Sequence, residues 1–214
     1  MKSQEKQVSY RTTNSYTTLN ELTQNTKHVW LVCHGIGYLS RYFLKYFNEL
    51  PADENYIIAP QAPSKYYLNG EYKHVGASWL TKENTGMGID NVVSYLDTVY
   101  TAEHIPPHCK LIVFGYSQGV SVAMRWVAKS KVNCHQLVLY SGGIPHELVT
   151  GDFDFLKENN TRVTIIIGDK DQYLTPERME TESKKIETLF QERAKQLIFE
   201  GGHEVKKEII NQLV

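Results

Sequence analysis

The sequence has little of what marks several classes of protein. Its three cysteines, Cys33, Cys109 and Cys134, are odd in number and show no CxxC spacing. They argue against a disulfide framework and favour a reducing compartment. No apolar run approaches the roughly 18 residues that a membrane span needs, and the first residues lack the apolar stretch of a secretory signal. We therefore expect a cytoplasmic protein without stable membrane insertion.

The chain also lacks an excess of either charge. Its 23 Lys and Arg face 24 Asp and Glu, a net charge of −1, which removes the electrostatic reason to expect nucleic-acid binding. No low-complexity or coiled-coil composition is present. The 214 residues, 41% of them hydrophobic, can bury a core of their own, and this length predicts one domain over residues 1–214.

Buried strands alternate with amphipathic helices along most of the chain. Nearly continuous apolar runs, typical of strands buried on both faces, lie at 29–33, 56–59, 111–114, 137–140 and 163–167. Helical spacing of apolar residues occurs over 89–100 and again over 205–213. This order predicts an α/β fold, a mostly parallel central sheet with helices on both faces. The weak alternation in the first two dozen residues predicts an antiparallel hairpin at the N-terminal edge of the sheet.

The segment 61–88 is irregular and rich in glycine. It carries four aromatic residues, Tyr66, Tyr67, Tyr72 and Trp79, among turn residues. A loop of this length within a domain is usually functional or mobile. Two interpretations remain open: the aromatic side chains line a substrate groove, or they pack the loop onto the body of the protein.

The most informative stretch is Gly115-Tyr-Ser117-Gln-Gly119, which directly follows a buried strand and precedes a predicted helix. This is the strand–turn–helix context of the G-x-S-x-G nucleophile elbow. The small residues on either side of the serine allow the strand and the helix to approach each other closely. The sequence therefore predicts Ser117 as a nucleophile at the carboxyl edge of the sheet.

A serine nucleophile needs a base, and three histidines follow Ser117. His135 opens a predicted strand, and His146 lies in a loop after Pro145. His203 follows Gly201 and Gly202, which let the loop carry the ring over the edge of the sheet. We predict His203 as the base and keep His146 as the alternative.

The base needs an orienting acid, and Asp169 and Asp171 both follow the apolar run 163–167. Asp169 stands beside the strand end, where it could cap the turn. Asp171 lies farther into the loop that ends at Pro176, and the spacing favours it. Asp152 and Asp154, after the preceding strand, are weaker candidates.

An acyl-transfer site also needs donors for the oxyanion. The amide of Gln118 opens the helix after the nucleophile and is one candidate. The second is expected in the loop after the first buried parallel strand, where we select the backbone amide of Ile36. The side chain of His34 is interpreted as a brace of this loop.

Together these residues resemble the carboxylesterase, lysophospholipase and acyl-protein thioesterase branch of the α/β-hydrolases. The likeness runs from about Val29 to the end of the chain, in seven short matches that follow the family order. They are His34-Gly-Ile-Gly37, Ala59-Pro-Gln-Ala-Pro63, Ser78-Trp79, Gly115-Tyr-Ser-Gln-Gly119, Ser141-Gly-Gly-Ile-Pro145, Asp171-Gln-Tyr-Leu-Thr-Pro176 and Gly202-His-Glu204. The sequence departs from the family pattern at Tyr38, Gln61 and Val120.

The resemblance implies the α/β-hydrolase fold and a Ser117–His203–Asp171 triad, with oxyanion donation from Ile36 and Gln118. It selects Asp171 over Asp169, because the family's acid opens the segment that ends in proline. It implies hydrolysis of a small ester or thioester through an acyl-enzyme, with no cofactor and no metal, and it leaves a homodimer as a candidate assembly.

Other functions were weighed against this one. A serine peptidase or amidase would use the same triad, and a hydrolase-fold binding protein without turnover is a further alternative. A dinucleotide site at His34–Ser40 lacks its third glycine, since Ser40 stands in that place. His104 and His108 have the i, i+4 spacing of a metal site, but Pro106 and Pro107 break the helix that such a pair needs.

Overall fold

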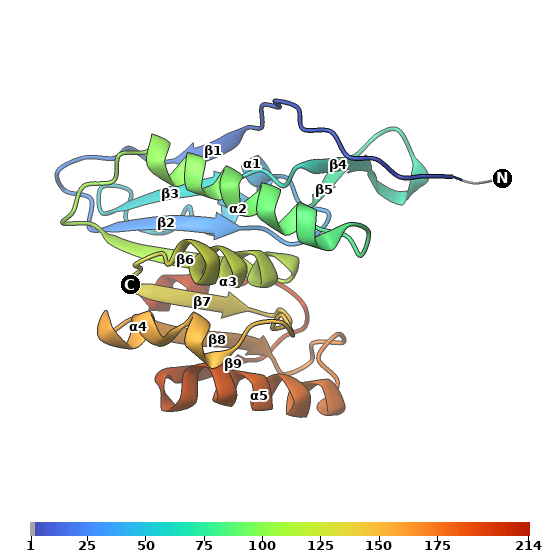
Figure 1. Cartoon of the computed structure of the whole chain (residues 1–214). Coiled ribbons are helices and arrows are strands. Elements are labelled where there is room, and N and C mark those ends of the chain that lie inside the picture. The colour runs from blue at the N-terminus through green and yellow to red at the C-terminus, as the bar shows by residue number, and fades with distance from the viewer. Residues whose placement is uncertain (1–2) are drawn as a thin grey trace.

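The computed structural model describes residues 3–214, and a mixed seven-stranded sheet runs through it in the order β1-β3-β2-β6-β7-β8-β9 (Figure 1). The strands are β1 (Tyr16–Leu19), β2 (His28–Cys33), β3 (Asn55–Pro60), β6 (Lys110–Tyr116), β7 (Gln136–Tyr140), β8 (Arg162–Gly168) and β9 (Ala194–Phe199). All neighbours pair in parallel except β1 and β3. The predicted mostly parallel sheet is confirmed.

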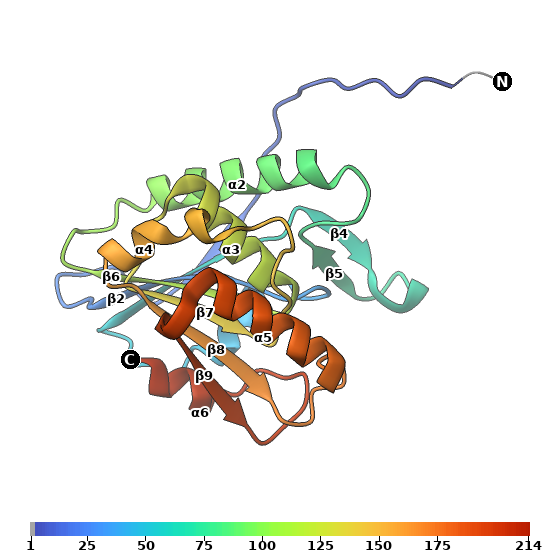
Figure 2. The same cartoon turned by 60° about the horizontal axis from the view of Figure 1, so that its bottom comes forward.

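Helices cover both faces of this sheet, as the continuous apolar runs require. One face carries α2 (Thr85–Ala102), α3 (Gln118–Ser130), α4 (Asp154–Glu158) and α5 (Pro176–Phe190) (Figure 2). The other carries α1 (Ser40–Phe43), η1 (Leu44–Tyr46), α6 (Lys207–Ile210) and η5 (Asn211–Leu213). Two further short helical turns, η3 (Thr150–Asp152) and η4 (Gln191–Arg193), precede α4 and β9.

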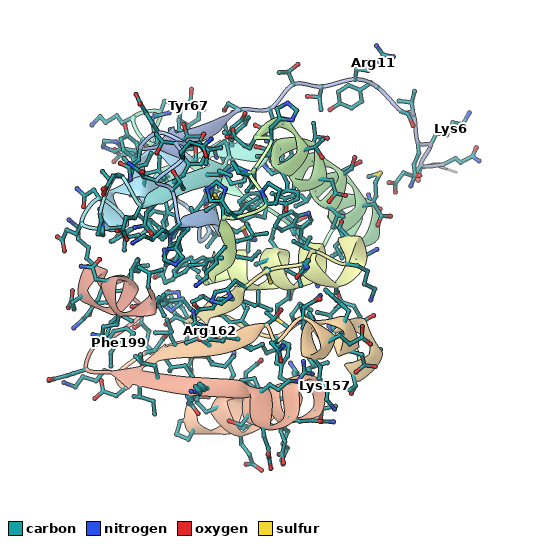
Figure 3. All side chains as sticks on the ribbon, turned by 90° about the vertical axis from the view of Figure 1, so that its left-hand side faces the viewer. Lys6, Arg11, Tyr67, Lys157, Arg162 and Phe199 are labelled. Atoms are coloured by element: carbon teal, nitrogen blue, oxygen red, sulfur yellow. The ribbon has the colours of Figure 1, made fainter. Side chains whose placement is uncertain are left out.

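The N-terminal edge of the sheet is antiparallel, as predicted, but the pairing differs from a hairpin within the first residues. Thr17 of β1 lies opposite Ala59 of β3. Val8 and Tyr10 are 86% and 81% exposed, and Lys6 and Arg11 lie on an extended arm away from the body (Figure 3). Residues 3–15 form no strand, and β1 pairs with β3.

The irregular segment 61–88 contains a small antiparallel sheet of its own, β4 (Ser64–Tyr67) and β5 (Val75–Ser78), joined through η2 (Leu68–Gly70). This hairpin projects beyond the carboxyl ends of the central strands (Figures 1 and 2). The hairpin packs closely against the loop after β2. There is no room for a side chain at Gly76, since a β-carbon there would lie 2.6 Å from the carbonyl oxygen of Gly37. The hairpin therefore borders the edge of the sheet where the predicted site residues lie.

Candidate active site

Ser117 occupies a sharp turn between β6 and α3. Its φ of 53° and ψ of −116° lie in a region that residues with a β-carbon rarely adopt. The turn is held because the amide of Ser117 donates to the carbonyl of Tyr140 at 2.9 Å. A β-carbon on Gly119 would collide with the carbonyl oxygen of Cys33, at the end of β2. The glycine therefore lets α3 start directly against the sheet, which fixes the serine at the carboxyl edge.

His203 and Asp171 complete a hydrogen-bonded series with Ser117. Nε2 of His203 lies 2.9 Å from Oγ of Ser117, and Nδ1 lies 2.7 Å from Oδ2 of Asp171. The side chain of Asp171 is 0% exposed and that of His203 is 16% exposed. The second carboxylate oxygen of Asp171, Oδ1, accepts from the backbone amide of Tyr173 at 2.9 Å. A buried carboxylate with these partners holds the imidazole in one orientation.

The series has a defined direction for proton transfer. A carboxylate only accepts, so Nδ1 of His203 carries the hydrogen and Nε2 presents a lone pair to the hydroxyl of Ser117. The backbone of the histidine is fixed as well, since the hydroxyl of Tyr116 donates to the carbonyl of His203 at 2.9 Å. The ring of Tyr173 meets the His203 ring edge-on, with centroids 4.8 Å apart. The arrangement can remove a proton from the serine without a rearrangement of the ring.

The alternative candidates lie elsewhere. Asp169 accepts from the amide of Gly201 at 2.9 Å and so ties the loop after β8 to the loop that carries His203. Asp152 accepts from the amide of Val149, and Asp154 is the exposed first residue of α4.

The alternative bases lie apart from Ser117 as well. His135 precedes β7 at the amino end of the sheet and contacts Arg162. His146 is 90% exposed and lies near Glu147.

The predicted oxyanion donors belong to two segments close to Ser117. Gln118 is the first residue of α3, so its amide has no acceptor within the helix. The loop after β2 comes close to the nucleophile, because a β-carbon on Gly35 would lie 3.2 Å from the β-carbon of Ser117. Within residues 3–214, the amides of Ile36 and Gln118 have no protein acceptor. Both are therefore free to donate to a substrate oxygen.

The side chains of His34 and Gln118 hold these loops in place. His34 is 0% exposed; its Nδ1 lies 2.8 Å from the carbonyl of Gly35, and its Nε2 accepts from the amide of Ala62 at 3.2 Å. Burial lowers the pKa of His34 to about 4, which keeps the ring neutral. The side-chain amide of Gln118 accepts from the backbone amide of Trp79 and donates to the carbonyl of Leu80. The prediction that His34 braces its loop agrees with these contacts.

Sequence analysis left two features of the site unassigned. Of the four aromatic residues in the segment 61–88, Trp79 is buried and donates from its indole to the carbonyl of His34 at 2.8 Å, whereas Tyr67 and Tyr72 are exposed. Trp79 therefore packs the loop onto the body.

Sequence analysis gave no role to Tyr173, whose ring contacts the ring of His203. The signal for this contact was an aromatic residue two positions after the predicted acid.

Neither a metal site nor a membrane-spanning helix is found among residues 3–214. Within the described part of the chain, no group of three or more His, Cys, Asp or Glu is arranged to hold a metal ion. His104 and His108 flank a turn and not a helix. Among residues 3–214, no helix has both the length and the apolar character for a membrane crossing.

Comparisons with known proteins bear on the family and the fold. A family model described as "Serine hydrolase (FSH1)" matches residues 45–211. The fold is similar to that of acyl-protein thioesterase 2 from Zea mays, with a TM-score of 0.72 and 16% identity over 94% of this chain and 96% of that one. It is also similar to a phospholipase/carboxylesterase from Dyadobacter fermentans, with a TM-score of 0.67 and 20% identity over 95% and 97%.

A third structure, esterase PE8, has a TM-score of 0.64 and 18% identity over 95% of this chain and all of that one. At these identities the similarity shows the fold, which is the α/β-hydrolase fold. No curated protein sequence matched the chain significantly.

Proposed function

The chain belongs to the FSH1 family of serine hydrolases, and from that premise we propose that it hydrolyses carboxylic esters or thioesters with Ser117 as nucleophile, His203 as base and Asp171 as orienting acid. The observation that carries the proposal is the unbroken hydrogen-bonded series from Ser117 Oγ through His203 to the buried Asp171. Three residues from three separate loops meet in the order that general-base catalysis requires.

The proposed reaction has two halves. Nε2 of His203 takes the proton of Ser117 while Oγ attacks the carbonyl carbon, and the amides of Ile36 and Gln118 bind the resulting oxyanion. The tetrahedral intermediate then expels the alcohol or thiol, which receives the proton from His203, and an acyl-enzyme remains. Water, deprotonated by His203, attacks the acyl-enzyme; the carboxylic acid leaves and the hydroxyl of Ser117 is restored.

The strained turn supports this assignment of the nucleophile. A residue with a β-carbon at a φ of 53° and a ψ of −116° is strained, and the surrounding glycines keep it there. The turn directs Oγ toward His203 and places the amide of Gln118 at the start of α3, where the helix dipole favours negative charge. A serine with only a structural role would need neither feature.

Initial rates on p-nitrophenyl esters of increasing acyl length test the proposal, with Ser117→Ala measured beside the native chain. Turnover that vanishes in the variant supports the serine esterase. Turnover that survives in Ser117→Ala contradicts it. Matched p-nitroanilides should react far more slowly than the esters, and the opposite preference would favour the peptidase or amidase alternative.

A further inference from the structure

A cationic side chain next to the proposed catalytic residues has no role in the chemistry described above. Arg178 belongs to the first turn of α5, its side chain is exposed, and its Nη1 donates to the carbonyl of Tyr173 at 2.9 Å. Tyr173 in turn contacts His203 through its ring. The guanidinium is therefore attached to the loop that carries Asp171.

The other end of the guanidinium lies over the loop after β7. A β-carbon on Gly143 would lie 2.9 Å from Nη2 of Arg178, so the absence of a side chain at this position makes room for the guanidinium. The neighbouring Gly142 packs against the carbonyl oxygen of Ser117. Arg178 thus contacts two loops that flank the pair Ser117 and His203, at the same edge of the sheet.

In the part of the chain that the structure describes, no acidic side chain neutralises Arg178. Within residues 3–214, Arg178 forms no ion pair. Glu182 also lies beside Gly143, but its carboxylate accepts from the amide of Ile144 at 2.7 Å and pairs with Lys185 at 3.3 Å. Asp171 is buried against His203. The positive charge of Arg178 therefore remains available.

The stability of α5 does not explain the position of this arginine. A cation in the first turn of a helix opposes the helix dipole, and the N-cap of α5 is already provided by the side chain of Thr175, which accepts from the amide of Arg178. An exposed planar fork of donors, held at one nitrogen and open at the others, is suited to bind a carboxylate in a bidentate manner.

We infer that Arg178 binds a free carboxylate on the substrate, so that the preferred substrates are esters or thioesters that also carry a carboxylate group. This inference rests on the proposed function and specifies its substrate class. The carboxylate can belong to the acyl part or to the alcohol part of the ester, and one pair of compounds is needed for each.

For the acyl part, kcat/KM is compared between the mono-p-nitrophenyl ester of adipic acid and p-nitrophenyl hexanoate, which differ at the far end of the chain. For the alcohol part, 4-acetoxybenzoate is compared with its methyl ester. In at least one pair the native chain should prefer the charged compound. Arg178→Gln should reduce that preference by about 10- to 100-fold, the size expected for a lost charge-assisted hydrogen bond, and leave the neutral compound nearly unchanged.

Three further variants separate charge from geometry. Arg178→Lys keeps the charge but loses the fork, so its preference should fall between those of the native chain and Arg178→Gln. Gly143→Ala should also lower the preference, because the added methyl group displaces Nη2. Lys184→Gln, on the exposed side of the same helix and paired with Glu180, is the matched control and should change nothing.

Equal loss on charged and neutral compounds in Arg178→Gln would overturn the inference, because the arginine would then only hold Tyr173. An unchanged preference in both pairs would overturn it too. Calorimetry with monomethyl adipate and dimethyl adipate on Ser117→Ala keeps the test independent of turnover. Binding of the monoester alone, lost in the double variant with Arg178→Gln, supports the carboxylate site even if no ester is hydrolysed, an outcome in which only the proposed function fails.

Discussion

Two histidines lie at the carboxyl edge of the sheet, and both have a partner at each ring nitrogen. Those of His34 are backbone groups, the carbonyl of Gly35 and the amide of Ala62. Those of His203 are the carboxylate of Asp171 and the hydroxyl of Ser117. His34 is fully buried, whereas the side chain of His203 is 16% exposed.

The difference teaches that the chemistry of the partners, and not the residue type or the position in the fold, distinguishes a structural histidine from one with a group that can give it a proton. Burial keeps His34 neutral, and its backbone partners fix one tautomer and give it no proton to exchange. In the proposed mechanism, the carboxylate on one side of His203 stabilises the imidazolium that would form when the hydroxyl on the other side loses its proton.

The largest expected effect is the loss of kcat when His203 or its partner Ser117 is removed. His203→Ala and Ser117→Ala should each lower kcat by about 10⁶-fold, and the double variant should be no worse than either, because the two side chains act as a unit. Steady-state kinetics on a single p-nitrophenyl ester measure this. Losses that multiply in the double variant would contradict a shared mechanism.

The next effect concerns the acid. Asp171→Asn should lower kcat by about 10⁴-fold, since an amide can donate to Nδ1 and so favour the wrong tautomer of His203. Asp169→Asn is the matched control: its side-chain oxygen can still accept from the amide of Gly201, so kcat should stay near the native value. If the two variants exchanged these effects, Asp169 would be the acid.

Sequence analysis could predict β2, β3, β6, β7 and β8, because buried parallel strands leave continuous apolar runs. Ser117 and Asp171 follow two of these runs, whereas His203 was selected from the two glycines before it. Spacing favoured Asp171 over Asp169 but did not decide between them. Asp169 reaches the backbone of Gly201 while Asp171 reaches the ring of His203, two contacts to the same distant loop that differ only in three dimensions. The pairing of β1 with β3 likewise depends on a strand far along the chain.

For the other histidine of the comparison, His34, we expect that substitution lowers stability. His34→Phe should lower the free energy of unfolding by about 2 to 4 kcal/mol, because the amide of Ala62 and the carbonyl of Gly35 would lose their partners inside the protein. His203→Phe should change stability far less and activity far more. Urea denaturation beside kinetics checks both, and equal destabilisation by the two variants would remove the distinction.

The smallest effect is a pH dependence of stability. Burial holds the pKa of His34 near 4, below the value of about 6.5 expected in the unfolded chain. The unfolded state therefore binds the proton more readily, and stability should fall as the pH drops from 6.5 toward 4, by about 3 kcal/mol from this residue. Urea midpoints across this range should fall more steeply for the native chain than for His34→Phe. Parallel curves would show that His34 is already protonated in the folded state.

The most direct test of the central claim is to map where a fluorophosphonate, which phosphonylates activated serines, reacts with the chain. One adduct should be found by mass spectrometry on the peptide that contains Ser117, and its formation should be strongly slowed in His203→Ala. An adduct at another residue, or an unreactive Ser117 in a preparation that hydrolyses esters, would contradict the assignment of Ser117 and His203 as nucleophile and base.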